Sequence, residues 1–213
     1  MGFAKSLYEY NSPTFRAARS HPYVRGIGDG SLPREVFSRW IVQDWLYLQG
    51  YIDALEKACL LAPDTSTGLL WSKLRNLTVE EELALHRGLA GKFDLDLEDL
   101  EEAKPYQATK HYLDTLKAAS RNYPTLIATL TPCAVGYAEI ARELHAQNAC
   151  AEPDYIAWIL TYLDPAFQET VHRFETELDR CGVDGATREM IKDAYARAAQ
   201  CELGFWNGLW QGY

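Results

Sequence analysis

The sequence predicts an all-α protein that folds as a single helical bundle. Apolar residues recur three and four positions apart along almost the whole chain, which is the spacing of one helix face. No segment shows the alternation of apolar and polar residues, bounded by turn residues, that indicates a β-strand. The chain has 213 residues and contains no linker, internal repeat or low-complexity stretch. We therefore expect one domain over residues 1–213.

Each predicted helix is bounded by residues that start or stop helices. The first covers residues 3–20, and the glycine- and proline-rich stretch HPYVRGIGDGSLPREVF ends it with turns. Ser31 is the expected N-cap of the next helix, with Pro33 in its first turn, and the sequence APD ends that helix after Leu61. Further helices are expected at 66–92, 96–104 (stopped by Pro105), 108–121, 124–147, 153–163, 165–180 and 186–209. Their short connections predict antiparallel neighbours in a bundle.

Composition and charge exclude several classes of protein. A net charge of -9 argues against nucleic-acid binding and against docking on an anionic membrane, because both need basic patches. The first fifteen residues lack the apolar core of a signal peptide, and no run of about 18 apolar residues predicts a membrane span. Five scattered cysteines without a CxxC pair are typical of free thiols in a reducing compartment. We expect a cytoplasmic protein.

A carboxylate interrupts the apolar stripe of the second long predicted helix. Asp44 lies four residues from Trp40 and from Leu48, on the face that should enter the core. Burying this group without a partner would cost several kcal/mol or shift its pKa, so it needs one. Tyr47 and Tyr51 follow at helical spacing on the same face.

Two further helices place a reactive side chain in an apolar stripe. Glu202 interrupts the stripe of the last helix, and Cys133 lies in the stripe of helix 124–147 with Tyr137 four residues later. Pro132 removes a backbone donor and frees the carbonyl of Ala128, so a kink there would open space beside the thiol.

Each of these residues has an ordinary explanation when it is taken alone. A buried cysteine is commonly a small apolar residue, an inward aspartate can pair with an arginine, and tyrosines at helical spacing are usually core residues. Together, however, the acids, the thiol and the phenols come from different helices whose apolar faces converge in a bundle. The pattern therefore favours one polar chamber inside the bundle.

Two spacings also allow a metal site. Glu169 and His172 have the spacing of a di-iron ligand pair, and Glu82 and His86 share a helix face. A di-iron site needs two such pairs and two more inward carboxylates. Because FQETVHRFETELDR is heavily charged, we expect Glu169 and His172 to face solvent, and we predict neither a metal nor another cofactor.

Five blocks of this sequence resemble the TenA / thiaminase II family of heme-oxygenase-like helical proteins. They follow one another in the order of that family and span about residues 10 to 207. The blocks are HPYVRGIGDGSLPREVFSRWIVQDWLYL, EELALHRGL, LTPCAVGYAEIARELH, YIAWILTYLDPAF and CELGFW.

The resemblance implies an aminopyrimidine aminohydrolase of the subgroup that carries a cysteine. Such enzymes hydrolyse 4-amino-5-aminomethyl-2-methylpyrimidine to the hydroxymethyl compound and ammonia in thiamin salvage, and many also cleave thiamin. It also implies a homotetramer, and the aromatic segment FWNGLWQGY would suit an interface. The family motifs match the catalytic residues to Cys133 and Glu202, and the substrate-binding residues to Asp44, Tyr47, Tyr112, Tyr137, Tyr162 and Phe205; Tyr51 joins them from its place on the Asp44 face.

The sequence departs from the family pattern at two points. LDPAF stands after Tyr162 where SSEEF is common, which affects the expected shape of that wall and the choice of leaving group. Trp45 stands where tyrosine is common. Two other functions use the same scaffold: a non-catalytic pyrimidine-binding or regulatory protein, and a di-iron oxygenase.

Overall fold

The structure is a computed structural model that describes residues 2–213, with only the backbone described for Glu81 and Leu97. Residues 2–213 contain helices and no strand, so the all-α prediction is confirmed. The helices are α1 Phe3–Tyr10, α2 Ser12–Arg19, α3 Pro22–Asp29, α4 Arg34–Leu61, α5 Thr65–Leu77, the π-helix η1 Thr78–Glu82, α6 Leu83–Lys92, α7 Leu97–Glu101, α8 Gln107–Ala119, α9 Tyr123–Gln147, α10 Pro153–Thr161, α11 Pro165–Cys181 and α12 Gly185–Gln211.

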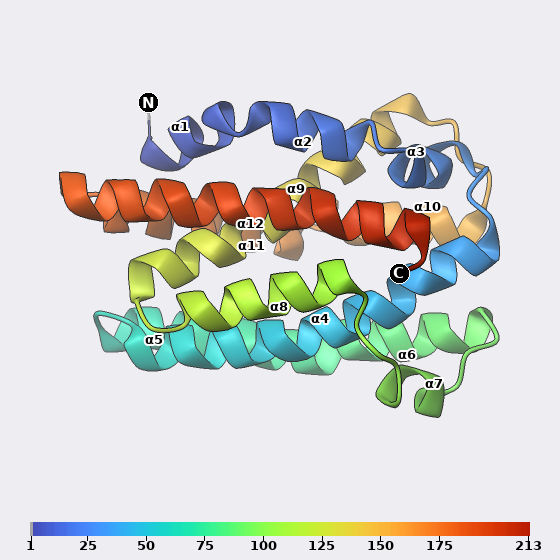
Figure 1. The fold of residues 1–213 in the computed structure, drawn as a ribbon, viewed down its shortest axis with the longest axis horizontal. Coiled ribbons are helices and arrows are strands. Elements are labelled where there is room, and N and C mark those ends of the chain that lie inside the picture. Colours follow the sequence, from blue (N-terminus) through green and yellow to red (C-terminus); the bar gives the residue numbers. More distant parts are fainter. Residues whose placement is uncertain (1) are drawn as a thin grey trace.

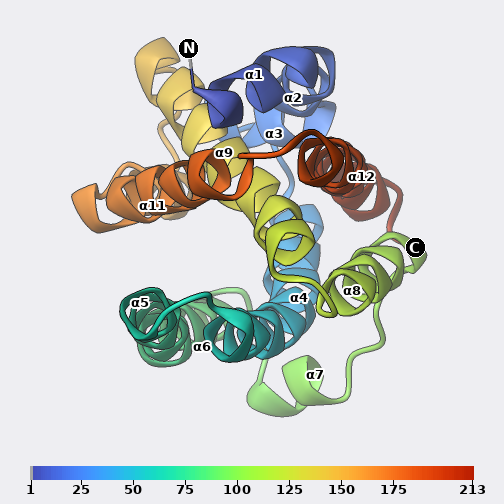
Figure 2. The same ribbon diagram turned by 90° about the vertical axis from the view of Figure 1, so that its left-hand side faces the viewer.

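The long helices form a bundle around α9. In Figure 1, α12, α8, α4 and the α5–α6 rod run close to the long axis of the molecule, and in Figure 2 α9 crosses the middle of the bundle. α9 packs against α12, α11, α8 and α4. It is buried along most of its length, because residues 125–138, TLIATLTPCAVGYA, carry no charged side chain on any face.

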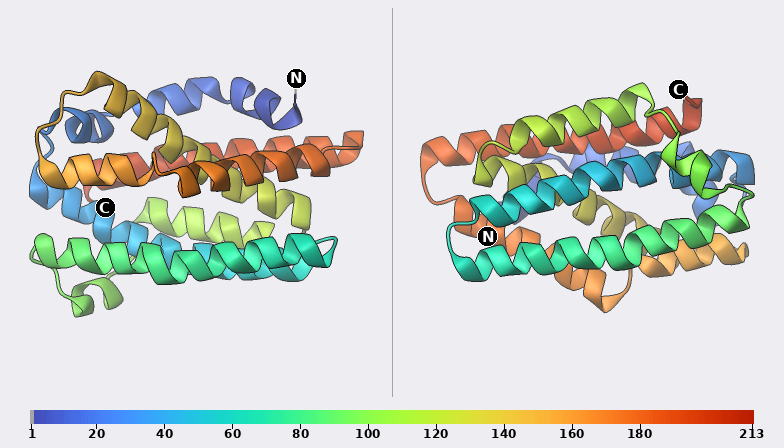
Figure 3. Two further views of the ribbon diagram at one scale, coloured as in Figure 1. Left: turned by 180° about the vertical axis from the view of Figure 1, so that it is seen from behind. Right: turned by 90° about the horizontal axis from the view of Figure 1, so that it is seen from below.

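A rod of three consecutive helical segments packs beside α4. α5, η1 and α6 continue as one long rod beside α4, which Figure 3 shows from behind and from below. The sequence predicted this rod as a single helix over residues 66–92. The structure inserts the wider turn Thr78–Glu82 in its middle, a feature that occurs frequently at functional sites.

The predicted helix over residues 3–20 is wrong at its centre, where the structure has two helices. α1 ends at Tyr10, α2 begins at Ser12, and Asn11 lies between them. Pro13 has no backbone N–H to donate to the carbonyl of Glu9, and its ring would clash with that carbonyl in a continuous helix.

The turns expected in HPYVRGIGDG are also wrong, because Pro22–Asp29 forms α3. The His21 side chain accepts a hydrogen bond from the N–H of Tyr23 at the start of α3, and Gly30 ends the helix in the left-handed conformation with φ of 77°. Ser31 is not the N-cap of α4, whose N-cap is Pro33. The glycine content of this stretch predicted a loop, whereas the structure has a helix that His21 and Gly30 cap.

Within residues 2–213, no helix combines the length and the apolar character that a membrane span would need.

Candidate active site

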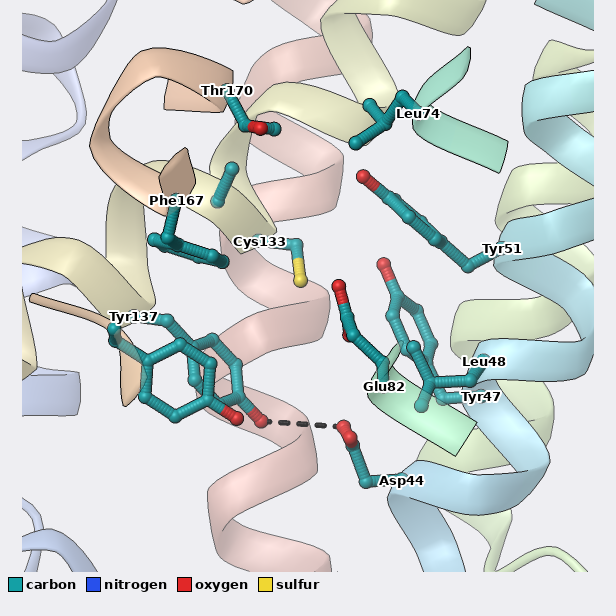
Figure 4. Close-up of a pocket in the computed structure, with 12 residues that line it drawn as sticks. Asp44, Tyr47, Leu48, Tyr51, Leu74, Glu82, Cys133, Tyr137, Phe167 and Thr170 are labelled. Carbon is teal, nitrogen blue, oxygen red and sulfur yellow. Dashed lines mark hydrogen bonds between the residues drawn. The ribbon is translucent and has the colours of Figure 1, made fainter. Parts of the chain in front are cut away.

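A pocket of about 510 Å³, open mouth included, lies between α4, α9, η1 and α11 (Figure 4). An inner recess of about 160 Å³ continues it toward α8 and α12. The pocket and the recess share Asp44, Tyr47, Cys133 and Tyr137. The pocket is also lined by Leu48, Tyr51, Leu74, Glu82, Ala134, Tyr162, Phe167 and Thr170, and the recess by Tyr112, Glu202 and Phe205.

The structure therefore brings the nine sequence-predicted site residues around one connected space. α4 contributes Asp44, Tyr47 and Tyr51 from successive turns of one face, because residues three, four and seven apart share a helix face. α9 contributes Cys133 and Tyr137 in the same way. The other four come from three further parts of the chain: Tyr112 from α8, Tyr162 from the end of α10, and Glu202 and Phe205 from α12.

Asp44 has two side-chain partners in the pocket wall. Its Oδ2 lies 2.9 Å from Nε2 of His86, and its Oδ1 accepts a hydrogen bond of 3.4 Å from the Tyr137 hydroxyl. That hydroxyl itself accepts a hydrogen bond of 2.9 Å from the indole N–H of Trp40. A buried Asp44 needs a partner, and His86 is that partner.

Glu202 is a buried carboxyl group whose environment favours the protonated form. It is 5% exposed, and Oε1 accepts a hydrogen bond of 2.6 Å from the Tyr112 hydroxyl. Burial raises the pKa of Glu202 to about 7, the negative charge of Asp44 adds to this shift, and the hydrogen bond from Tyr112 opposes it. Glu202 can therefore hold a proton near neutral pH and give it to a basic atom in the recess.

Cys133 points into the pocket from α9, as Figure 4 shows. Burial raises the pKa of its thiol well above the usual range, and the charges of Glu202 and Asp44 raise it further. These surroundings therefore favour the protonated thiol over the thiolate. α9 continues as one helix through Pro132.

Aromatic rings form two groups in the walls. Tyr47 packs on Tyr112 with ring centroids 4.7 Å apart, and Phe205 lies 6.4 Å from Tyr47. Tyr137 packs on Tyr162 at 4.7 Å. These faces suit a flat ring that stacks on aromatic side chains.

The two possible metal pairs have other partners or positions. Glu169 forms an ion pair with Arg173 and is largely exposed, and His172 is exposed, as expected for a solvated face. His86 binds Asp44 and the backbone oxygen of Glu82. In the part of the chain that the structure describes, no three His, Cys, Asp or Glu side chains gather as a metal site would require.

Sequence reasoning did not assign Glu82 and His86 to the site. Glu82 lies in the acidic run VEEEL, which is typical of a solvated face, but η1 directs its carboxylate into the pocket (Figure 4). His86 appeared only as a possible metal ligand. The only sequence feature that pointed to His86 is its helical spacing from Glu82. This spacing places the two residues on one helix face but does not reveal that His86 contacts Asp44.

The departure LDPAF builds the outer edge of the pocket. Asp164 caps α11 by accepting a hydrogen bond of 2.8 Å from the N–H of Ala166, and Phe167 lines the pocket. An outer cleft adjoins the pocket and includes Asp164, Ala166 and His86. This segment thus borders both the pocket and the adjoining cleft.

Comparison with known proteins agrees with this architecture. The model of the TENA/THI-4/PQQC family matches residues 12–212. The chain belongs to this family. It is 33% identical to an aminopyrimidine aminohydrolase of Halalkalibacterium halodurans, over 97% of this chain and 95% of that protein.

Solved structures confirm the fold of this TENA/THI-4/PQQC member. A TenA homologue from P. horikoshii OT3 superposes with a TM-score of 0.94 and 26% identity, covering both chains completely. A heme-oxygenase-like domain of Shewanella denitrificans superposes with a TM-score of 0.77 at 11% identity, over 98% of this chain and 92% of that one, which shows the fold alone. The heme-oxygenase-like fold and the resemblance to the TenA / thiaminase II family are confirmed.

Proposed function

We propose that this protein is an aminopyrimidine aminohydrolase of thiamin salvage, which hydrolyses 4-amino-5-aminomethyl-2-methylpyrimidine and can also cleave thiamin. The observation that supports it most directly is the shared chamber, in which a thiol, a protonated carboxyl group and a carboxylate surround a space lined by aromatic rings. The name of the Halalkalibacterium halodurans relative supports the same activity over nearly the full chain.

In the proposed mechanism, Glu202 protonates a ring nitrogen of the pyrimidine. The sulfur of Cys133 then adds to the ring carbon beside the substituted position. The ring can accept it because the π-bond between this carbon and the protonated nitrogen opens, and its electron pair moves to that nitrogen. Those electrons return to expel the amine, which takes the thiol proton and leaves as ammonia. This leaves an exocyclic methylene carbon bound to the ring.

Water completes the reaction and regenerates the side chains. The hydroxyl of water adds to the exocyclic methylene carbon and the carbon–sulfur bond breaks, and the remaining water proton passes to the released sulfur to restore the thiol. The ring becomes aromatic again as its nitrogen returns a proton to Glu202. The sum is one amine and one water converted to one alcohol and one ammonia, so no redox cofactor is required. Asp44 accepts a hydrogen bond from the amino group on the ring, and Tyr47, Tyr51, Tyr112, Tyr137, Tyr162 and Phe205 enclose the ring.

Ammonia release from the aminomethylpyrimidine, with thiamin as a parallel substrate, tests this proposal. Cys133→Ala should fold normally and lose turnover by about 10³-fold or more, since it lacks the nucleophile. Cys59→Ala is the control, because Cys59 is also half-buried but does not line the pocket. Near-normal ammonia release by Cys133→Ala would remove the covalent route. A wild type that binds the pyrimidine and releases no ammonia would instead be the non-catalytic binding protein.

We also propose that the enzyme is a cytoplasmic homotetramer. Trp210 and Tyr213, from the aromatic segment that ends the chain, are 46% and 68% exposed, as an interface segment of the monomer would be. Light scattering during size-exclusion chromatography should give four times the chain mass of 24.2 kDa. A monomer mass would contradict the tetramer without affecting the proposed reaction.

A further inference from the structure

His86 is a buried histidine directly behind Asp44, and the proposed reaction gives it no role. It lies in the second turn of α6, is 1% exposed, and packs on Trp40 with ring centroids 4.8 Å apart. Nε2 lies 2.9 Å from Oδ2 of Asp44, and Nδ1 lies 2.9 Å from the backbone oxygen of Glu82. Nε2 and Oδ2 lie within ion-pair distance, but their geometry is not that of a well-aligned hydrogen bond.

The donors and acceptors around this ring require a proton between His86 and Asp44. A backbone carbonyl only accepts, so Nδ1 must carry a hydrogen. A neutral imidazole has a single N–H, and its Nε2 would then present a lone pair to a carboxylate oxygen at 2.9 Å, which is repulsive. The contact is favourable only if the shared proton lies on Nε2 or on Oδ2.

The surroundings of Asp44 place that proton on His86. The second oxygen of Asp44 accepts from the Tyr137 hydroxyl, and the Trp40 N–H to the Tyr137 oxygen leaves the hydroxyl hydrogen free to point at Asp44. Hydrogen bonds to the charged form of a carboxyl group favour that form. The pair is therefore an imidazolium and a carboxylate.

The acidic groups facing His86 act in the same direction. Burial is the largest single influence and lowers the pKa of His86. The contact with Asp44 on α4 and the backbone oxygen and charge of Glu82 on η1 raise it, and together they outweigh burial, so the net shift is upward. On the outer side, His86 shares the adjoining cleft with Tyr162 and Asp164.

We propose that His86 is a positioning residue that keeps Asp44 ionised and fixes one of its oxygens, so that the other accepts a hydrogen bond from the ring amino group of the substrate. This inference rests on the proposed function. Without the imidazolium, the buried carboxylate would lose its counter-charge and favour the protonated form. A protonated Asp44 could present a donor to the substrate amino group, which is also a donor.

A double-mutant cycle separates this role from a purely structural one. His86→Leu should lower kcat/KM for the aminomethylpyrimidine by about 10- to 100-fold, the factor that one hydrogen bond to a charged group contributes, and mainly by raising KM. In the Asp44→Asn background the same substitution should change kcat/KM by less than about threefold, because its target is already neutral. An equal loss in both backgrounds would overturn the inference.

Two further variants serve as controls in this cycle. His86→Gln keeps an N–H donor without a charge and should lose less activity than His86→Leu; it also replaces His86→Leu in the cycle if that variant unfolds. His21→Leu removes another buried histidine, which lies 3.2 Å from Asn207 and outside the pocket, and should leave kcat/KM unchanged. A loss with His21→Leu as large as with His86→Leu would mean that the kinetic effect is not specific to the pocket.

The charge of His86 can be measured without turnover. Carbon NMR of Cε1-labelled histidine, with the His86 signal assigned by its loss in His86→Gln, should show a protonated ring at pH 7.5 in the wild type and a neutral ring in Asp44→Asn. A neutral His86 in an active wild type overturns this inference alone. A wild type that releases no ammonia overturns the proposed function and the positioning role together, whatever the state of His86.

Discussion

At the scale of single residues, the site is built from groups whose burial shifts their proton equilibria. Glu202 and Cys133 both have raised pKa values, and burial is the largest cause for each. The two shifts serve the proposed reaction differently. A raised pKa keeps Glu202 protonated and ready to donate, whereas it keeps Cys133 in the unreactive thiol form until substrate arrives. In the proposed reaction, protonation of the ring by Glu202 therefore precedes attack by Cys133.

The raised pKa of Glu202 predicts that the free energy of unfolding decreases as the pH rises. Between the ordinary carboxyl value of 4.5 and the folded value of about 7, the native state binds the proton more tightly than the unfolded state. The stabilisation is complete below pH 4.5 and is lost as the pH rises through about 7, by about 3 kcal/mol. Urea unfolding from pH 4.5 to 8 should show this decline in the wild type relative to Glu202→Gln.

An exposed glutamate provides the control for this measurement. The Glu189 side chain is 71% exposed, so the difference between wild type and Glu189→Gln should stay nearly constant over the same pH range. If wild type and Glu202→Gln kept a constant difference as well, Glu202 would not be held protonated by the fold.

Tyr112 offers a second test of the Glu202 assignment. Its hydroxyl donates the 2.6 Å hydrogen bond that favours the ionised form of Glu202. Tyr112→Phe should therefore raise the pKa of Glu202, and the pH at which kcat/KM falls on the alkaline side should move upward. A pH–rate profile of both proteins measures this shift. An unchanged alkaline limb would assign that limb to another group.

The sequence predicted the nine pocket residues that interrupt apolar stripes or match family motifs. It did not predict Glu82 and His86, which lie beside them. Asp44 is visible because a carboxylate stands among Trp40, Ile41 and Leu48. His86 has no comparable signal, since its role depends on a contact between α6 and α4 that no local pattern encodes. Glu82 was hidden for a different reason: an acidic run looks solvated until the path of the backbone is known.

At the scale of elements, helix ends and one widened turn account for the differences from prediction. Periodicity located the long helices because apolar spacing extends over many turns. It did not locate η1, since one extra residue in a turn hardly alters that spacing. It also missed α3, a helix of two turns whose glycines look like loop residues and whose ends are capped by His21 and Gly30.

Gly30 gives a prediction for the end of α3. Its φ of 77° is unfavourable for any residue with a Cβ, although the nearest atom to an added Cβ would be 3.7 Å away, so the cost is conformational and not steric. Gly30→Ala should destabilise the protein by about 1–2 kcal/mol and lower Tm by about 2–8 °C. Gly88→Ala, at an exposed helical position with open space, should instead stabilise by about 0.4–1 kcal/mol. Equal thermal shifts in the two variants would contradict the role of φ at Gly30.

At the scale of the whole molecule, polar residues from the apolar stripes of different helices meet in one place because α9 runs through the middle of the bundle. Cys133 and Tyr137 on α9 meet α4 on one side and α12 on the other, so residues nearly 160 positions apart in sequence, such as Asp44 and Glu202, border the same recess. The order of the long helices was predictable from sequence. The helix faces that meet were harder to predict. A buried carboxylate such as Asp44 must have a partner, but the sequence does not say which residue that partner is.

The charge of the whole molecule predicts which large partners it does not bind. Lysine and arginine total 21 against 30 acidic residues, and several of the basic side chains are already neutralised by neighbouring acids. Arg19 pairs with Glu143 at 2.7 Å, and Arg34 with Asp154 at 3.1 Å. Since binding to phosphate backbones depends on free basic groups that release counterions, we expect no binding to duplex DNA or to phosphatidylserine vesicles even at low salt. Fluorescence anisotropy and vesicle sedimentation would measure this, and affinity for DNA that weakens as salt is added would favour a regulatory protein over the hydrolase.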